Sequence, residues 1–439
     1  MSKHETQSTR RRFLGDSGRI LAAGITWPIL DRIKLPAVAR EGMPAASENA
    51  RTLVVIYLRG GADALNVVIP WSNNRYYGIR PTIAIPRESK DGGPAVIKLT
   101  DDHGIHPAMA PLKQLFEEKR FTAVLGVGSP HPTRSHFDAQ DFMEYAAPGD
   151  RTVKDGWLNR YLRATRKESG EQPMRALAMQ GLLPRSLRGR EPVLAVPRLS
   201  RNKSEGLLDL FDDVYRGEAE MAAGMGGTRR EEDAKEAVIE VGRSTIEVLR
   251  RFWDITEKTE GPGQGVTYPN HRFGRRMALL ARVIKSRCGL EVAALDLPSW
   301  DHHQGEGATD GLINRQLRAL SGSLDAFFKD LGPLSQAVTV LVMTEFGRTV
   351  AENGNRGTDH GRGGCMLALG AGLSPRRRII GDYGSLKPKD LYDGRDLNVD
   401  IDFRQVFAET LEGVFGFKPG KGFFPRWSPG RKIGLMRRA

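Results

Sequence analysis

The sequence predicts an α/β fold in which a mainly parallel sheet is sandwiched by helices. Continuous apolar, β-branched runs at residues 53–58 and 337–344 are typical of buried parallel strands. Apolar residues recur at helical spacing over residues 317–331, between two such runs. Strands that alternate with helices favour a parallel sheet with helices on both faces.

The elements follow one another along most of the chain. Strand 53–58 precedes a helix at 107–119 and a strand at 121–128, which together form a predicted βαβ unit. The later predicted elements are a helix at 271–286, a strand at 290–297, the helix containing 317–331, strands at 337–344 and 366–369, and a closing helix at 404–414.

The predicted organisation is a leader at residues 1–40 and one α/β domain over residues 51–439. Residues 160–270 interrupt the alternation with a glycine-rich segment at 222–227 and a polar helix at about 231–252. We therefore interpret 160–270 as a helical insertion or cap.

Composition excludes several classes of protein. The net charge is +13, but residues 1–40 hold eight Lys or Arg and three Asp or Glu, so they carry +5 and the remainder +8. The basic residues of the remainder form no stripe interleaved with aromatics, which argues against nucleic-acid binding. No apolar run approaches the roughly 18 residues of a membrane span, and two cysteines form neither a disulfide framework nor a cysteine zinc site.

The N-terminus is typical of an export signal. The segment Arg10-Arg11-Arg12-Phe13-Leu14 precedes apolar residues 20–25 and a small-residue cleavage motif at 37–39. Paired arginines followed by Phe and Leu resemble a twin-arginine signal, so we expect recognition by the twin-arginine translocation machinery and a periplasmic or extracellular location. A basic N-terminus with chance arginines, or a leader retained as an anchor, stays an alternative.

Acids and histidines gather where the predicted strands end. Ligands of open α/β sheets bind beyond the carboxyl ends of the strands, and carboxylates and imidazoles are ligands of divalent zinc or manganese. Two metals need about six such groups. The candidate ligands are Asp63, Asp301, His303, Glu345, Asp359 and His360.

The loop after the second strand supplies candidate reactive groups. Ser135 or Thr133, at the predicted start of a helix, could attack a phosphate or sulfate ester beside such metals. Arg134 or Arg348 could bind the anionic oxygens of the ester bidentately. Structural roles are the alternatives: Ser135 as a helix N-cap, the acids as turn residues, and Arg348 in a local ion pair with Glu345.

The order of these motifs resembles the bacterial DUF1501 family over nearly the whole mature chain. The matching blocks are Leu58–Asp63, Ser135–Phe137, Gly156–Leu158, Trp300–His303, Thr344–Arg348 and Gly357–Gly361, together with the twin-arginine leader.

The resemblance implies an alkaline-phosphatase-like fold with a site for up to two metal ions, as in phosphatases and sulfatases. Asp63, Ser135 or Thr133, Asp301 with His303, and His360 follow the superfamily order. Asp301 and His303 lie two residues apart rather than four, and Glu345-Phe346 or Asp359-His360 takes the place of a further Asp-His pair. The hypothesis is an exported metal-dependent hydrolase of phosphate or sulfate esters; the alternative is a catalytically inactive exported binding or assembly protein.

Overall fold

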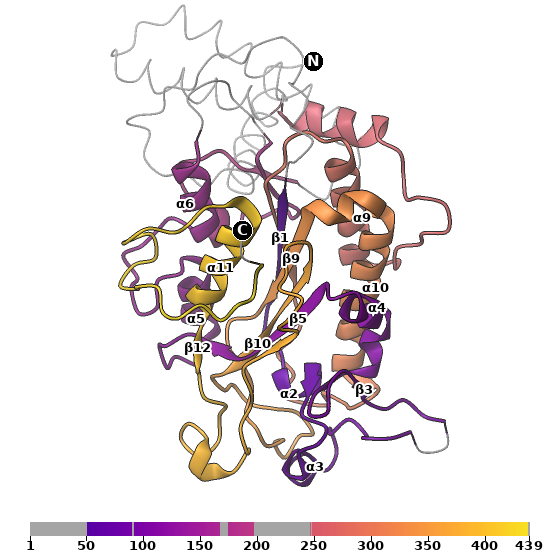
Figure 1. The fold of residues 1–439 in the computed structure, drawn as a ribbon, viewed down its shortest axis with the longest axis vertical. Coiled ribbons are helices and arrows are strands. Elements are labelled where there is room, and N and C mark those ends of the chain that lie inside the picture. Colours follow the sequence, from indigo (N-terminus) through magenta and orange to yellow (C-terminus); the bar gives the residue numbers. More distant parts are fainter. Residues whose placement is uncertain (1–50, 90–91, 167–173, 197–245, 247, 438–439) are drawn as a thin grey trace, which may run out of the picture.

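The computed structural model describes residues 51–437 except 90–91, 167–173, 197–245 and 247. Within this part of the chain a nine-stranded sheet lies between two layers of helices (Figure 1). Its strands are β1 (Thr52–Leu58), β5 (Phe121–Gly128), β6 (Ala176–Ala178), β7 (Leu194–Ala195), β8 (Val292–Leu297), β9 (Val338–Met343), β10 (Gly364–Gly370), β11 (Ile379–Ile380) and β12 (Ile401–Asp402). A second, small sheet joins β2 (Val68–Ile69), β4 (Gly104–Ile105) and β3 (Ile97–Lys98).

The large sheet is mostly parallel. Its order is β11-β5-β10-β9-β1-β8-β6-β7, and β12 pairs with β5. Strand β10 is antiparallel to both of its neighbours, whereas the other pairs in this sheet are parallel. The structure therefore confirms the predicted α/β class with a mainly parallel sheet.

Helices cover both faces of the sheet. Helices α4 (Lys113–Glu117), α9 (Arg272–Lys285) and α10 (Gly311–Leu331) lie on one face, and α5 (His136–Glu144), α6 (Trp157–Ala164) and α11 (Phe403–Phe415) lie on the other (Figure 1). Residues 248–258 are also helical, and the other named helices are short: α2 (Ala64–Val67), α3 (Asn74–Ile79) and the 3₁₀ turns η1 (Pro107–Leu112), η2 (Arg185–Leu187), η3 (Gly332–Ala337) and η4 (Pro388–Asp390).

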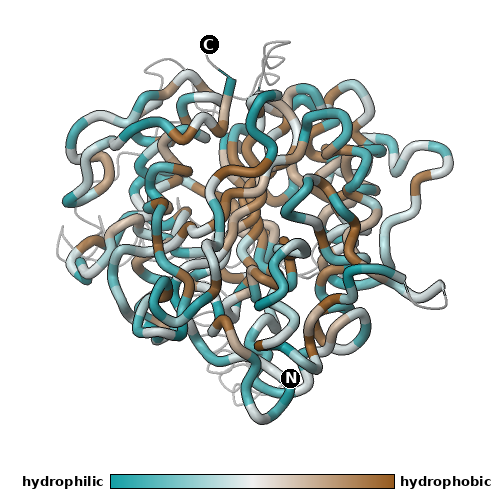
Figure 2. The backbone as a smooth tube through the Cα atoms, turned by 60° about the horizontal axis from the view of Figure 1, so that its bottom comes forward, coloured by the Kyte–Doolittle hydropathy of each residue, from teal (hydrophilic) through white to brown (hydrophobic). Residues whose placement is uncertain are grey.

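A separate hydrophobic core lies on each face of the sheet, and β1 contributes side chains to both. Its side chains alternate, with Val54, Ile56 and Leu58 in one core and Leu53 and Val55 in the other. Burial on both faces explains why the strand is a continuous apolar run. In Figure 2 the hydrophobic segments accordingly lie at the centre of the molecule.

Helix α10 shows how the sequence pattern becomes structure. The apolar residues that recur at helical spacing within residues 317–331 are all buried against the sheet. The helix stops at Gly332, whose φ of 52° is readily adopted by glycine.

Three predictions need correction. Strands β1 and β5 are not adjacent, because β9 and β10 lie between them. The helix expected at 107–119 is a 3₁₀ turn followed by the short α4, with Pro111 inside the turn. Residues 176–195, expected within a helical insertion, add β6 and β7 to the main sheet.

The predicted polar helix at 231–252 lies mostly outside the described residues, as does the leader at 1–40. In the part of the chain that the structure describes, no helix has the length and apolar character needed to cross a bilayer.

Candidate metal centre

The strand-end motifs meet at one edge of the sheet. Strands β1, β5, β8 and β9 run in the same direction, so the loops that follow them emerge together. The loop before the antiparallel β10 returns to the same edge. This topology brings residues near positions 60, 136, 301, 345 and 360 into one cluster, although they are far apart in the sequence.

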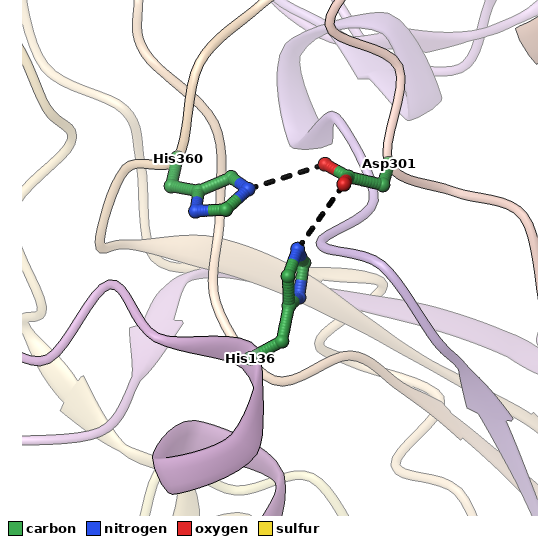
Figure 3. A group of neighbouring side chains, drawn as sticks. All are labelled: His136, Asp301 and His360. Carbon is green, nitrogen blue, oxygen red and sulfur yellow. Dashed lines mark hydrogen bonds and ion pairs between the residues drawn. The ribbon is translucent and has the colours of Figure 1, made fainter.

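His136, Asp301 and His360 form the centre of this cluster (Figure 3). One potential ligand atom from each lies within 4.8 Å of the others. His136 Nε2 is 3.4 Å from Asp301 Oδ2, and His360 Nε2 is 3.2 Å from Asp301 Oδ1. The side chains thus converge from the start of α5, the loop after β8 and the loop before β10.

His303 is a fourth member of the cluster. Its Nε2 is 2.9 Å from His360 Nε2 and 3.0 Å from Asp301 Oδ1. Its Nδ1 is 3.0 Å from Asp359 Oδ1, so Asp359 contacts the far side of the ring. Asp359 therefore orients His303 rather than facing the other three side chains.

Glu345 also orients an imidazole ring, that of His136, through the nitrogen that does not face Asp301. This carboxylate is buried at the end of β9, and its Oε1 is 2.8 Å from His136 Nδ1. The same oxygen accepts hydrogen bonds from Gly60 N and Gln140 Nε2, and Oε2 accepts one from Thr344 Oγ1. Burial alone would raise the pKa of Glu345, but the hydrogen bonds from His136 and Gln140 lower it overall. Glu345 therefore stays ionised, and the pKa of His136 is raised, chiefly by this hydrogen bond.

Arg348 joins the loops that carry the cluster. Its fully buried guanidinium donates to the carbonyls of Gly60, Gly61, Trp300 and Thr358 and to Asp301 Oδ1. The hydrogen bond and charge of Arg348 outweigh burial and hold the pKa of Asp301 below its usual range. Arg348 thus connects three loops and has no free face for a substrate anion, contrary to the prediction that it clamps one.

Arg134 is engaged as well. It donates to Asp396 Oδ2 and to Asp393 Oδ2. Its backbone carbonyl accepts from His360 Nδ1 at 2.8 Å, so the residue supports the cluster through its main chain. The predicted role of its side chain as an anion clamp does not fit these ion pairs.

Asp63 does not face the cluster as a free ligand. Both of its oxygens bind the buried Arg80, which also donates to the carbonyls of Thr349 and Val350. Burial would raise the pKa of Asp63, but Arg80 lowers it overall. The neighbouring buried Glu306 has its pKa raised well above the usual value, first by burial and then by the charge of Asp63. Asp63, which was predicted to be a metal ligand, thus forms a structural ion pair with Arg80.

The two candidate nucleophiles differ in their contacts. Thr133 Oγ1 accepts a hydrogen bond from Ser135 N at 3.2 Å. Ser135 is the exposed N-cap residue of α5, and its side chain makes no capping hydrogen bond. Ser135 therefore occupies the N-cap position, as the alternative interpretation predicted, but its hydroxyl does not cap the helix. Ser135 directly precedes His136, and its hydroxyl is free of a capping hydrogen bond.

His136 is the member of the cluster that the predicted ligand set missed. It lies in the Ser135–Phe137 block, which we interpreted as a nucleophile loop. Its position just after a strand is the same signal that identified Asp301 and His360. His302, which follows Asp301 in the sequence, is buried apart from the cluster, with its Nε2 2.9 Å from the Ser299 carbonyl.

The chemistry of these four side chains fits a metal cation. Each of the three imidazoles has Nδ1 next to an oxygen acceptor: Glu345, Asp359 or the Arg134 carbonyl. Such contacts fix the Nδ1–H tautomer and leave Nε2 as a ligand atom, which is the usual support of metal-binding histidines.

The comparisons with known proteins give a family and little more. No curated protein matches the chain significantly. Among solved structures, the phosphonate monoester hydrolase of Agrobacterium radiobacter is similar at 10% sequence identity, over 87% of this chain and 78% of that chain. The TM-score of 0.27 is too low for this likeness to support a conclusion about function.

A family profile matches most of the chain. The profile described as "Protein of unknown function (DUF1501)" aligns with residues 50–421. This span contains all six motif blocks and the whole cluster around Asp301. The chain therefore belongs to the DUF1501 family.

Proposed function

We propose that this protein is an exported, metal-dependent hydrolase of phosphate or sulfate esters. The observation that carries the proposal is the convergence of His136 and His360 on Asp301, each ring with Nε2 turned inward (Figure 3). The order of the motifs along the chain and the mostly parallel sheet favour an alkaline-phosphatase-like fold as part of the same proposal.

The chain's own residues supply binding and attack. A divalent cation at the cluster would polarise a phosphoryl or sulfuryl oxygen and lower the pKa of a nearby hydroxyl. Ser135 provides that hydroxyl, and its oxygen attacks phosphorus or sulfur as the bond to the ester's alcohol breaks. Solvent water takes the serine proton and supplies one to the departing alcohol; a second water then attacks the serine ester, which releases phosphate or sulfate and restores the Ser135 hydroxyl.

Steady-state assays of the purified protein, loaded with Zn²⁺ or Mn²⁺, on aryl phosphates and aryl sulfates test this function. We expect Ser135→Ala to lower kcat by at least about 10³-fold while metal content is unchanged, because a nucleophile is lost and no ligand is. Thr133→Val is the matched control and should keep most of the activity. Asp301→Ala should lose both metal and activity.

A catalytically inactive exported binding or assembly protein is the second candidate. It is favoured by the arginines: both expected anion clamps, Arg134 and Arg348, are held by carboxylates and carbonyls of the chain. A protein that binds metal, binds a phosphate or sulfate ester and turns over none of the panel would support this candidate and refute the hydrolase.

Export through the twin-arginine route is part of the proposal, supported by the leader sequence at residues 10–14. Replacing Arg10 and Arg11 together with lysine keeps the charge but removes the guanidinium pair. Immunodetection after cell fractionation should then find the protein in the cytoplasm. Continued export of the double variant would refute the assignment.

A further inference from the structure

We infer that the cluster holds one divalent transition-metal ion rather than two, with His136, His303 and His360 as nitrogen ligands and Asp301 as the carboxylate. The inference rests on the metal-binding part of the proposed function and deepens it by fixing the number and class of the ion. It departs from the two-metal site that the alkaline-phosphatase-like resemblance implies.

The three imidazole rings are oriented so that each turns a nitrogen lone pair towards Asp301. His136, His303 and His360 each have Nδ1 within 3.0 Å of an oxygen that can only accept a hydrogen bond: Glu345 Oε1, Asp359 Oδ1 and the Arg134 carbonyl, respectively. Each Nδ1 must therefore carry its ring's proton in the neutral form, and each Nε2 presents a lone pair. All three Nε2 atoms face the carboxylate of Asp301.

Lone pairs that face one another at this distance repel unless a cation or a proton lies between them. His303 Nε2 and His360 Nε2 are 2.9 Å apart, and both lie within 3.2 Å of Asp301 Oδ1. His136 Nε2 is buried and makes no hydrogen bond, and its contact is the one with Asp301 Oδ2 at 3.4 Å. A single cation would be attracted to all four of these electron-rich atoms at once, whereas a proton can bridge only two of them.

The spacing suits a small, four-coordinate ion. Zinc–nitrogen distances of about 2.0–2.1 Å in a tetrahedral site place neighbouring ligand atoms roughly 3.3 Å apart. The nitrogen–oxygen separations of His136 and His360 from Asp301 are 3.4 and 3.2 Å. The His303–His360 separation of 2.9 Å needs to open by about 0.4 Å, which a small shift of the partly exposed His303 ring would provide.

The remaining predicted ligands offer too few free oxygens for a second site. Both oxygens of Asp63 bind Arg80, whose side chain is fully buried, so a cation there would face an unscreened guanidinium. Glu345 already accepts hydrogen bonds at both oxygens. Asp359 uses Oδ1 to accept hydrogen bonds from His303 and Asn353, and its remaining oxygen is one ligand atom, too few for a second site. These carboxylates are supports of the site and not additional ligands.

The ligand set also selects the class of metal. Imidazole nitrogens suit zinc and neighbouring transition ions, whereas magnesium and calcium prefer oxygen ligands. Three nitrogens and one carboxylate therefore favour an ion of the zinc class over the alkaline-earth ions.

Metal analysis of the full-length chain tests this inference. The protein is stripped with chelator, incubated with excess Zn²⁺ alone, desalted and analysed for zinc per chain by mass spectrometry. We expect one zinc per chain in the wild type and in Asp63→Asn. His136→Ala, His303→Ala and Asp301→Ala should each weaken zinc binding by at least about 100-fold, as judged by competition with a chromogenic chelator.

His271→Ala is a matched control, because His271 caps α9 away from the cluster through Nδ1 to Gly274 N. It should keep one zinc per chain. Circular dichroism of each variant shows that it is folded, and cobalt substitution gives a second readout. Intense visible bands of four-coordinate Co²⁺ are expected in the wild type and in Asp63→Asn.

The outcomes separate this inference from the proposed hydrolase. Two zinc ions per chain, one of them lost in Asp63→Asn, would overturn the single-ion site and leave the hydrolase standing. One zinc per chain without turnover would uphold the single-ion site and refute the hydrolase. No zinc binding by the folded wild type would overturn the site itself.

Discussion

Replacing Asp63 with alanine separates a structural aspartate from a metal ligand. Arg80 and Asp63 have side chains that are 0% and 3% exposed, so the variant leaves a guanidinium buried without its carboxylate. Breaking a buried ion pair in this way costs about 3–5 kcal/mol. Arg80 keeps bonds to Asn66 Oδ1 and two backbone carbonyls, and Glu306 could ionise in place of Asp63. We therefore expect a loss of about 3 kcal/mol, the lower end of that range.

Urea unfolding of the metal-stripped protein, followed by tryptophan fluorescence, measures this loss without a contribution from bound metal. A loss of about 3 kcal/mol is a large part of the 5–15 kcal/mol typical of native proteins. Asp101→Ala, at an exposed aspartate, is the control and should change stability by less than about 0.5 kcal/mol. If Asp63→Ala instead loses zinc while its unfolding curve matches the control, Asp63 is a ligand and the reasoning is refuted.

Three further predictions follow from the site and its surroundings. Gly60→Ala should weaken zinc binding at least about 10-fold by chelator competition, because its Cβ would lie 2.5 Å from the backbone nitrogen of Asp301 and φ is +127°; unchanged affinity would mean that this loop is not held rigidly. Arg348→Lys should lower the thermal midpoint and the zinc affinity together, since an ammonium with three donors cannot replace the guanidinium contacts to Thr358 and the neighbouring loops; an unaltered affinity in the folded variant would show that Arg348 does not position the site. Burial lowers the pKa of His106 to about 4, against about 6.5 when unfolded, so the unfolded chain takes up this proton first as the pH falls. His106 should therefore contribute a stability that is complete above pH 6.5 and that decreases by about 3 kcal/mol on going down to pH 4; this part of the pH dependence should be missing in urea titrations of His106→Gln, and equal slopes would contradict it.

The long strands could be predicted because they are buried on both faces. The predicted strand 121–128 matches β5, and 53–58 misses only Thr52 of β1. Strands β6 and β7 were missed because three- and two-residue strands carry no readable period. The sequence also did not reveal that β9 and β10 separate β1 from β5, since strand order depends on contacts between distant segments.

Some site residues could be predicted from the rule that ligands of open α/β sheets bind beyond the ends of the strands. Asp301, His303 and His360 follow or precede strands, and the structure brings them together. Asp63 obeys the same rule, yet Arg80, 17 residues away, takes both of its oxygens. Whether a carboxylate is free or paired depends on its three-dimensional neighbours, which spacing in the sequence does not show.

The central place of β1 has a consequence for how the protein is made. Thr52 at its start bonds to Leu290, 238 residues away, and the loop after its end bonds to Thr344, 282 residues away. A ribosome therefore releases this largely apolar strand long before either neighbouring strand has been synthesised. Pairing over such distances is slow, because a long loop must close first. We expect the nascent chain to depend on chaperones and to acquire its core only when synthesis is nearly complete.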